Sequence, residues 1–566
     1  MNNNNRLYLV ILVLFFAFQV DAEVFMVNSQ QEFDTAHDNA AEGDSILWED
    51  GTYMHIFMEI KNPGLYIAAE NIGMAIFSGG SSVRIFSDNI TLHGVQFIDG
   101  DIGSDDVINT SGSYNYFSEI NIHGYDSYKY LVIREECQYN TVIHCNFENR
   151  VNLDDKNILS ILVSASQPGY HKIQYCSFKN FAGSGNDLGI EPIRIGLSTQ
   201  ADRNSRSVVE YCFFTECDGD GEIISSKASQ NVYRHNTFAN NSKAELVLRH
   251  GSEAIVYGNF FLNGKGGVRV REGQDHYIYN NYFYNIDDRP IYLQNEASDP
   301  LDNINIAFNT IINSGELRLG GSGSNPPANV TFANNIFTNP TGALFEQATG
   351  TETWILNIGS GDFGIPAPST GLVNVSPVLF ENSAGFYQLS ESSPAIESAQ
   401  SGYSNLPQFE GIDDIDIEIL FDIMKQERAV LPFARDLGCS EYSDTIIVQP
   451  MATEANTGTS YDSSIASSIF PQKASSDIRL QVFPNPLVQD FLVKFELQEA
   501  AIVAISLLDL QGVKMDSFHS RFLTSGEHVK SFSIGDIPRG VYFIQLSTFD
   551  SSGKLMKEAV RQIVKN

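Results

Sequence analysis

The sequence predicts an all-β protein: a right-handed parallel β-helix followed by a small C-terminal β-sandwich. Two observations point to the β-helix. A short motif recurs every 22 to 36 residues, and apolar residues alternate with polar ones inside the repeats. A third observation, a change of composition after about residue 445, separates the repeats from a different C-terminal domain.

Residues 1–22 have the layout of a secretory signal peptide. Arg6 precedes an apolar run at 7–20, and Ala22 ends a stretch suited to cleavage. The run is too short to favour a membrane span, and no other stretch is long enough to cross a bilayer. We therefore expect an exported protein without a transmembrane segment.

Residues 23–445 are expected to form the parallel β-helix. The motif is a small or amide residue, any residue, then an apolar residue, and it begins at Val95, Ile120, Cys145, Cys176, Cys212, Asn236, Asn259, Asn281, Asn309 and Asn335. One period fits one coil of short strands, each pairing with its equivalent on the next coil. We expect the Asn residues to stack as a structural ladder, the Phe residues two positions later to stack in the core, and the Cys residues to be buried without disulfides. The signal fades after about residue 345, and residues 436–441 are expected to close the domain.

The segment 446–477 is rich in Ser, Thr, Ala and Asp and is expected to be a linker. Residues 478–566 combine alternating strands with turn residues, which favours a small β-sandwich. Motifs at 482–486, 508–512 and 538–542, with a basic tail, resemble the type A sorting domain of the type nine secretion system. That resemblance implies an export address read by the secretion machinery and a secreted or cell-surface protein.

The charge of the chain limits its partners. A net charge of −34 excludes nucleic acid and anionic membrane as general partners, because the average surface repels polyanions. Between residues 227 and 271, however, seven Lys or Arg residues face only two acidic ones. Such a basic stripe on an acidic protein suits the capture of a polyanionic chain.

The chemistry-bearing residues cluster in the same stretch. Asp220 and Glu222 are two apart in an extended strand, so they share a face and suit a hard cation such as Ca²⁺. Arg249 and Arg269 are expected to point outward from neighbouring rungs, and Lys227 belongs to the preceding rung. Simple alternation would direct the Lys227 side chain to the opposite face of the sheet from Glu222. A bend near residues 225–226 is therefore expected.

The residues 222–229, 233–238, 248–251 and 266–269 resemble polysaccharide lyase family six, which holds alginate lyases and chondroitinase B. The likeness spans roughly residues 25–441. It implies Ca²⁺-assisted β-elimination from an anionic uronate polysaccharide, alginate, giving 4,5-unsaturated oligosaccharides. The roles it implies are base for Lys227, acid for Arg249, substrate binding for Arg269 and His250, and metal binding for Asn186, Asp220 and Glu222. The family usually has Glu where this chain has Asp220.

Two alternatives stay open at this point. One is a chondroitin or dermatan sulfate lyase of the same family, and the other is a non-catalytic β-helical protein that binds polysaccharide at a surface. A glycoside hydrolase is disfavoured because it would need carboxylates flanking the glycosidic bond, where this stripe offers arginines.

Overall fold

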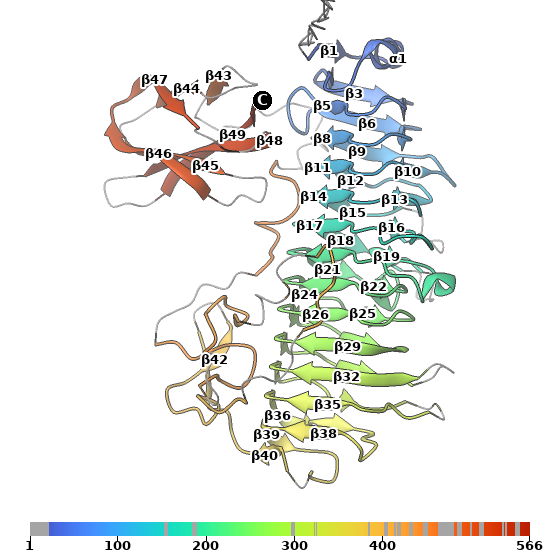
Figure 1. Ribbon diagram of the computed structural model, residues 1–566, viewed down its shortest axis with the longest axis vertical. Coiled ribbons are helices and arrows are strands. Elements are labelled where there is room, and N and C mark those ends of the chain that lie inside the picture. Colours follow the sequence, from blue (N-terminus) through green and yellow to red (C-terminus); the bar gives the residue numbers. More distant parts are fainter. Residues whose placement is uncertain are drawn as a thin grey trace, which may run out of the picture. The chain divides into compact units, whose positions relative to one another are not determined.

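The computed structural model describes residues 22–151, 157–183 and 189–295, most of 300–461, and parts of 480–565. The chain divides into two compact units, Met1–Ala466 and Ser467–Asn566. The first unit is a parallel β-solenoid with three long sheets, A, B and C, so the predicted fold class is confirmed (Figure 1). Residues 1–21 of the expected signal peptide lie outside the described residues.

Between β2 and β37 each rung contributes one strand to each sheet, in the order A, B, C along the chain. Sheet A contains β1 (Val24–Val27), β2 (Ser45–Trp48), β5 (Tyr66–Ala69), β8 (Thr91–His93), β11 (Tyr116–Ser118), β14 (Thr141–Ile143), β17 (Lys172–Gln174), β20 (Val208–Glu210), β23 (Val232–Arg234), β26 (Ile255–Tyr257), β29 (Gly273–Tyr279), β32 (Leu301–Ala307), β35 (Thr331–Ala333) and β38 (Thr353–Ile355). Sheet B contains β3 (Gly51–Met54), β6 (Ala75–Gly79), β9 (Val95–Gly100), β12 (Asn121–His123), β15 (Asn146–Glu148), β18 (Ser177–Phe181), β21 (Phe213–Cys217), β24 (Thr237–Ala239), β27 (Phe260–Leu262), β30 (Tyr282–Tyr284), β33 (Thr310–Ile312), β36 (Ile336–Ala343), β39 (Asn357–Asp362) and β40 (Leu372–Asn374). Sheet C contains β4 (Phe57–Ile60), β7 (Ser82–Ile85), β10 (Asp106–Thr110), β13 (Lys129–Ile133), β16 (Leu159–Ile161), β19 (Ile193–Ile195), β22 (Glu222–Ser226), β25 (Glu245–Leu248), β28 (Gly266–Val270), β31 (Arg289–Leu293), β34 (Leu317–Arg318) and β37 (Phe345–Glu346).

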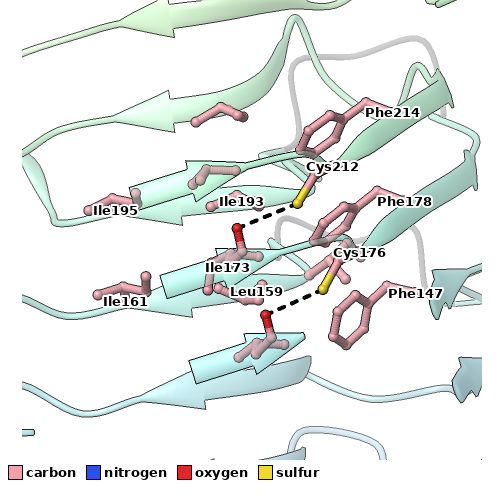
Figure 2. Close-up of a cluster of buried hydrophobic side chains, with 14 of the residues drawn as sticks. Phe147, Leu159, Ile161, Ile173, Cys176, Phe178, Ile193, Ile195, Cys212 and Phe214 are labelled. Carbon is pink, nitrogen blue, oxygen red and sulfur yellow. Dashed lines mark hydrogen bonds between the residues drawn. The ribbon is translucent and has the colours of Figure 1, made fainter. Parts of the chain in front are cut away.

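The core consists of columns of like side chains, because each rung places the same position above its predecessor. Aromatic rings stack from rung to rung with centroid separations of 4.7–5.1 Å, in the series Phe147, Phe178, Phe214, Phe238, Phe261 and Phe283. Figure 2 shows Cys176 and Cys212 beside this column, with their thiols directed at backbone carbonyls of the preceding rung. All six cysteines are buried and free, so the expectation of a buried stack is confirmed.

An asparagine ladder continues the cysteine column. The side-chain amide of Asn259 donates to Oδ1 of Asn281 over 3.0 Å, and Asn281 donates in turn to Asn309 over 3.0 Å. The ladder begins at Asn236 and extends to Asn357, one rung beyond the last residue found in the sequence pattern. The motif was missed there because Gly359 stands where an apolar residue was required. Sheet B runs on to β40, so the solenoid continues past residue 345, where the sequence signal fades.

Helix α1 (Gln30–Asn39) packs Phe33 and Ala36 into the core of the first rungs. Ser29 caps its N-terminus by accepting a hydrogen bond from the backbone N–H of Glu32. A short 3-10 helix, η1 (Ser198–Gln200), follows β19, and a hairpin of β41 (Leu379–Glu381) and β42 (Tyr387–Leu389) follows the solenoid strands. The helix covers apolar surface that the first rung would otherwise expose to water.

Two later segments run along the corner between sheets A and B. The backbone N–H groups of Gly438 and Cys439 donate to Asn334 and Thr310, so residues 436–441 lie along the side of the solenoid and do not close its end. Residues 451–461, here called the strap, fall in the range expected to be a linker. The strap is bonded to the solenoid: Gly458 N–H donates to Tyr175 O over 2.7 Å, and Ser460 N–H donates to Glu119 Oε2 over 2.6 Å.

The second unit contains two small antiparallel sheets. One has β43 (Gln481–Phe483), β44 (Asp490–Leu497) and β47 (Gly526–Ser533), and the other has β46 (Lys514–Leu523), β45 (Ala501–Leu508), β48 (Gly540–Phe549) and β49 (Leu555–Lys565). Val493 and Phe495 of the first sheet share a core with Ile505, Ile544 and Ile563 of the second. The predicted sandwich is therefore confirmed. Among the described residues, no helix is both long and apolar enough to cross a membrane.

Candidate active site on sheet C

The outer face of sheet C presents the predicted site residues in columns. Arg194, Ser225, Val247 and Arg269 are in register on β19, β22, β25 and β28. The flanking residues of these strands, such as Ile224 and Leu246, are buried in the core. Alternation therefore directs the column outward, as expected for Arg269.

A β-bulge brings Glu222 onto the same face as Lys227. Glu222 pairs with Glu245, but the next pair is Ile224 with Leu246, so Ile223 is an extra residue in β22. One extra residue reverses the side-chain alternation on one side of it. The expectation of a bend near residues 225–226 was thus right in kind and wrong in position, because the irregularity lies at Ile223.

Glu222 is shared by the two predicted arginines. The Arg249 guanidinium forms an ion pair with Glu222 Oε1, and Arg269 Nη2 lies 3.6 Å from the same oxygen. The Glu222 side chain is only 3% exposed, whereas that of Arg249 is 26% exposed. A buried carboxylate thus holds two guanidinium groups, each of which belongs to a partly exposed side chain.

Lys227 follows β22 directly and lies one rung before Arg249, whose backbone N–H donates to Ser226 O. Its Nζ is 4.0 Å from Glu191 Oε1. Burial lowers the pKa of Lys227; Glu191 and Glu222 oppose this shift, while Arg194 and Arg249 add to it. The lowering of the Lys227 pKa therefore comes first from desolvation, with Arg249 as a minor contributor.

Glu191 is a member of this cluster that the sequence analysis did not single out. Burial raises the pKa of Glu191 to about 7; Arg194 and Lys227 lower it, and Glu222 and Asp220 raise it. It stands just before β19, one rung before Glu222, and residue type and spacing alone do not mark it as part of the site. Asp220 is buried at 3% exposure and belongs to the same electrostatic cluster.

The fit of this cluster to Ca²⁺ can be judged from its oxygens. Glu191 Oε2 and Glu222 Oε2 are buried without a hydrogen-bond partner in the structure, and carboxylate oxygens are the ligands that Ca²⁺ prefers. Within the described residues, no group of three or more His, Cys, Asp or Glu side chains is assembled to hold a metal ion. The third predicted ligand, Asn186, lies outside the described residues. The donors present thus fit Ca²⁺ in chemistry.

His250 lies at the edge of the site, next to Arg249 in the chain. Its Nδ1 is 2.5 Å from Glu272 Oε2, and Glu272 is buried. This contact fixes the imidazole ring and leaves Nε2 for a ligand.

Comparison with known proteins identifies the solenoid. The sequence profile of the family described as chondroitinase B matches residues 27–316, just over half of the 566-residue chain. The chain belongs to this family. The profile of the secretion system C-terminal sorting domain matches residues 481–561, which marks this family member as a secreted or cell-surface protein. No curated protein matches the chain.

Solved structures agree with the family. The mannuronic acid specific polysaccharide family 6 lyase from human gut microbiota is 25% identical, with a TM-score of 0.56 over 62% of this chain and 91% of that chain. The PL6 family polysaccharide lyase Pedsa3628 from Pseudopedobacter saltans is 22% identical, with a TM-score of 0.53 over 62% of this chain and 96% of that chain. The PL6 family alginate lyase AlyGC is 21% identical, with a TM-score of 0.59 over 65% of this chain, and the match spans only 55% of AlyGC. The chain therefore has the fold of polysaccharide lyases of family six.

Proposed function

We propose that the protein is a lyase that cleaves alginate by β-elimination at a uronate. The observation that carries the proposal is the joint placement of Lys227 and Arg249, which follow neighbouring strands of sheet C and are both coupled to the buried Glu222. An amine with a lowered pKa next to a guanidinium suits removal of a proton beside a carboxylate. The relatives whose names include alginate or mannuronic acid support this substrate.

In this proposal Lys227 accepts the C5 proton of the uronate through its neutral amine. The electron pair of the C5–H bond forms the C4–C5 double bond, and the C4–O4 bond breaks. Arg249 hydrogen-bonds to the departing O4 and donates a proton to it, which the guanidinium regains from water, while Lys227 returns the C5 proton to water. Arg269 and His250 hold the polyanion. The products are a new reducing end and a chain that ends in a 4,5-unsaturated uronate.

Asp220, Glu222 and Asn186 would hold Ca²⁺, which when bound neutralises the uronate carboxylate and so makes the C5 proton more acidic. The chain's own contribution is burial. Because Glu222 is almost inaccessible to water, its charge acts on Lys227 and Arg249 with little screening.

The test is to incubate the purified protein with alginate, polygalacturonate and dermatan sulfate, with and without a chelator, and to follow the ultraviolet absorbance of the new double bond. We expect a rise with alginate that the chelator suppresses. Lys227→Ala should lower the rate by about 10²–10⁴-fold, the usual contribution of a positioned base. The matched control is Lys61→Ala, which removes an exposed lysine on an N-terminal rung.

The outcomes distinguish the proposed alginate lyase from the two alternative functions and test the roles of calcium and Lys227. A rise with dermatan sulfate alone would favour the substrate in the name of the matched family, chondroitinase B. Binding of alginate without any absorbance change would favour the non-catalytic alternative. A rise unaffected by the chelator would contradict the calcium role, and equal activity of the Lys227 and Lys61 variants would contradict the assignment of the base.

A further inference from the structure

Glu245 is a buried carboxylate for which neither the sequence analysis nor the proposed reaction has a role. It opens β25, is 4% exposed and pairs with Glu222 across the bulge. Paired positions on adjacent strands lie roughly 5 Å apart, where two buried carboxylates repel each other. A cation between them relieves this repulsion.

Arg269 supplies that cation from the next rung. Its Nε lies 3.0 Å from Glu245 Oε2, while its Nη2 lies 3.6 Å from Glu222 Oε1. The guanidinium is thus held between two carboxylates, with the shorter contact to Glu245. Arg289 is a second positive neighbour of Glu245. Without Glu245, the charge of Arg269 would be attracted to Glu222 alone.

A glycine makes room for this carboxylate. A Cβ atom at Gly266 would lie 2.2 Å from Glu245 Oε1. Gly266 does not have a left-handed backbone conformation. A glycine is therefore required here because a side chain would clash, and not because of the backbone conformation. The space that the Glu245 carboxylate occupies is therefore formed by residues of both β25 and β28.

We propose that Glu245 is a positioning residue that holds the Arg269 guanidinium in place for the substrate and away from full pairing with Glu222. This inference rests on the proposed function, because it assigns Arg269 to polyanion binding. Glu245 keeps Arg269 oriented, and Glu222 keeps an oxygen available for the site. Loss of Glu245 weakens substrate binding more than it slows the chemical step.

The experiment compares Glu245→Gln, Arg269→Ala and the double variant by steady-state kinetics on alginate. We expect Glu245→Gln to raise KM roughly tenfold, the effect of losing one charge-assisted contact, with a smaller change in kcat. Because Glu245 acts through Arg269, the substitution should have little further effect in the Arg269→Ala background. Gly266→Ala should reproduce the KM effect by displacing the carboxylate without changing its charge.

The control is Glu210→Gln, which removes another buried glutamate paired with an arginine, Arg234, on sheet A. It should lower stability and leave KM unchanged, which separates positioning from a general loss of folding. Additive KM effects of Glu245→Gln and Arg269→Ala would overturn the inference. An inactive wild-type protein would refute the proposed function instead. The inference about Glu245 would then be tested by a crystal structure of Glu245→Gln. An unmoved Arg269 guanidinium would overturn it, and a shift of that group toward Glu222 would support it.

Discussion

Glu119 lies beneath the strap, where its side-chain oxygen accepts a hydrogen bond from Ser460 N–H and its backbone oxygen accepts one from the Tyr461 hydroxyl. Burial raises the pKa of Glu119 to about 7, although the hydrogen bond from Ser460 favours the charged form. The folded protein therefore holds this proton more tightly than the unfolded chain does. Attachment of the strap is thereby linked to pH.

The sign of the effect follows from that difference. Below about pH 4.5 the carboxyl is protonated in both states, and as the pH rises toward 7 only the unfolded chain loses its proton. The contribution of Glu119 to stability should thus fall across this range. Glu119→Gln, which cannot ionise, should gain stability relative to the wild type as the pH rises from 4.5 to 7, measured by denaturant unfolding. Parallel pH profiles would contradict the prediction.

Individual site residues were predictable where residue type and rung spacing were sufficient. Arg249 and Arg269 could be placed because alternation gives the direction of a side chain and the period gives its rung. Lys227 could be placed on its rung but not on its face, because the extra residue at Ile223 reverses the alternation between it and Glu222. The roles of Glu191 and Glu245 depend on contacts between rungs, which alternation and period do not reveal.

At the scale of elements, the strap is held by contacts spread along residues 454–461, and Gly458 lies among them. It has φ +75°, and a Cβ atom there would lie 2.1 Å from Asn146 Oδ1. Composition alone indicated a linker, because a Ser- and Thr-rich segment carries little apolar pattern. The anchoring atoms include the backbone N–H groups of Gly458 and Ser460 and single side chains such as Tyr461, and composition reports neither.

Gly458→Ala should therefore lower the melting temperature and expose the strap to proteases. The matched control is Gly350→Ala, which has a similar φ of +80° but open space around the added Cβ. Both variants carry the conformational cost of roughly 1–2 kcal/mol, and only Gly458→Ala adds a steric clash. Equal losses of stability in calorimetry would mean that the strap does not pack as described.

At the scale of the whole molecule, stability in a solenoid is close to a sum over rungs and their interfaces. Asn281 links three rungs, since it accepts from Asn259 and donates to Asn309 and to Val256 O. Asn281→Ala should lower the free energy of unfolding by about 3 kcal/mol, at 1–3 kcal/mol for each buried group left without a partner. Asn71→Ala, at an exposed turn, is the control. Similar denaturation midpoints for the two variants would contradict the role of the ladder.

The fold as a whole was largely predictable, because a repeat displays the same physical requirement many times over. The Phe and Asn columns and three of the buried cysteines, Cys145, Cys176 and Cys212, follow from one motif. The last rungs and the side-lying segment 436–441 were not predictable. Gly359 stands two residues after Asn357, where the motif requires an apolar residue. The contacts of Gly438 with Asn334 and of Cys439 with Thr310 each join residues more than one hundred positions apart.

The extra residue at Ile223 makes the protein unusually sensitive to a one-residue deletion in β22. Corner loops of a solenoid absorb insertions and deletions, since they change only the length of a connection. Loss of a single codon at residue 223 would instead restore regular alternation through β22, and either the carboxylate of Glu222 or the amine of Lys227 would then have to turn into the apolar interior. Insertions and deletions should therefore be tolerated in the loops around β22 and removed by selection within the strand itself.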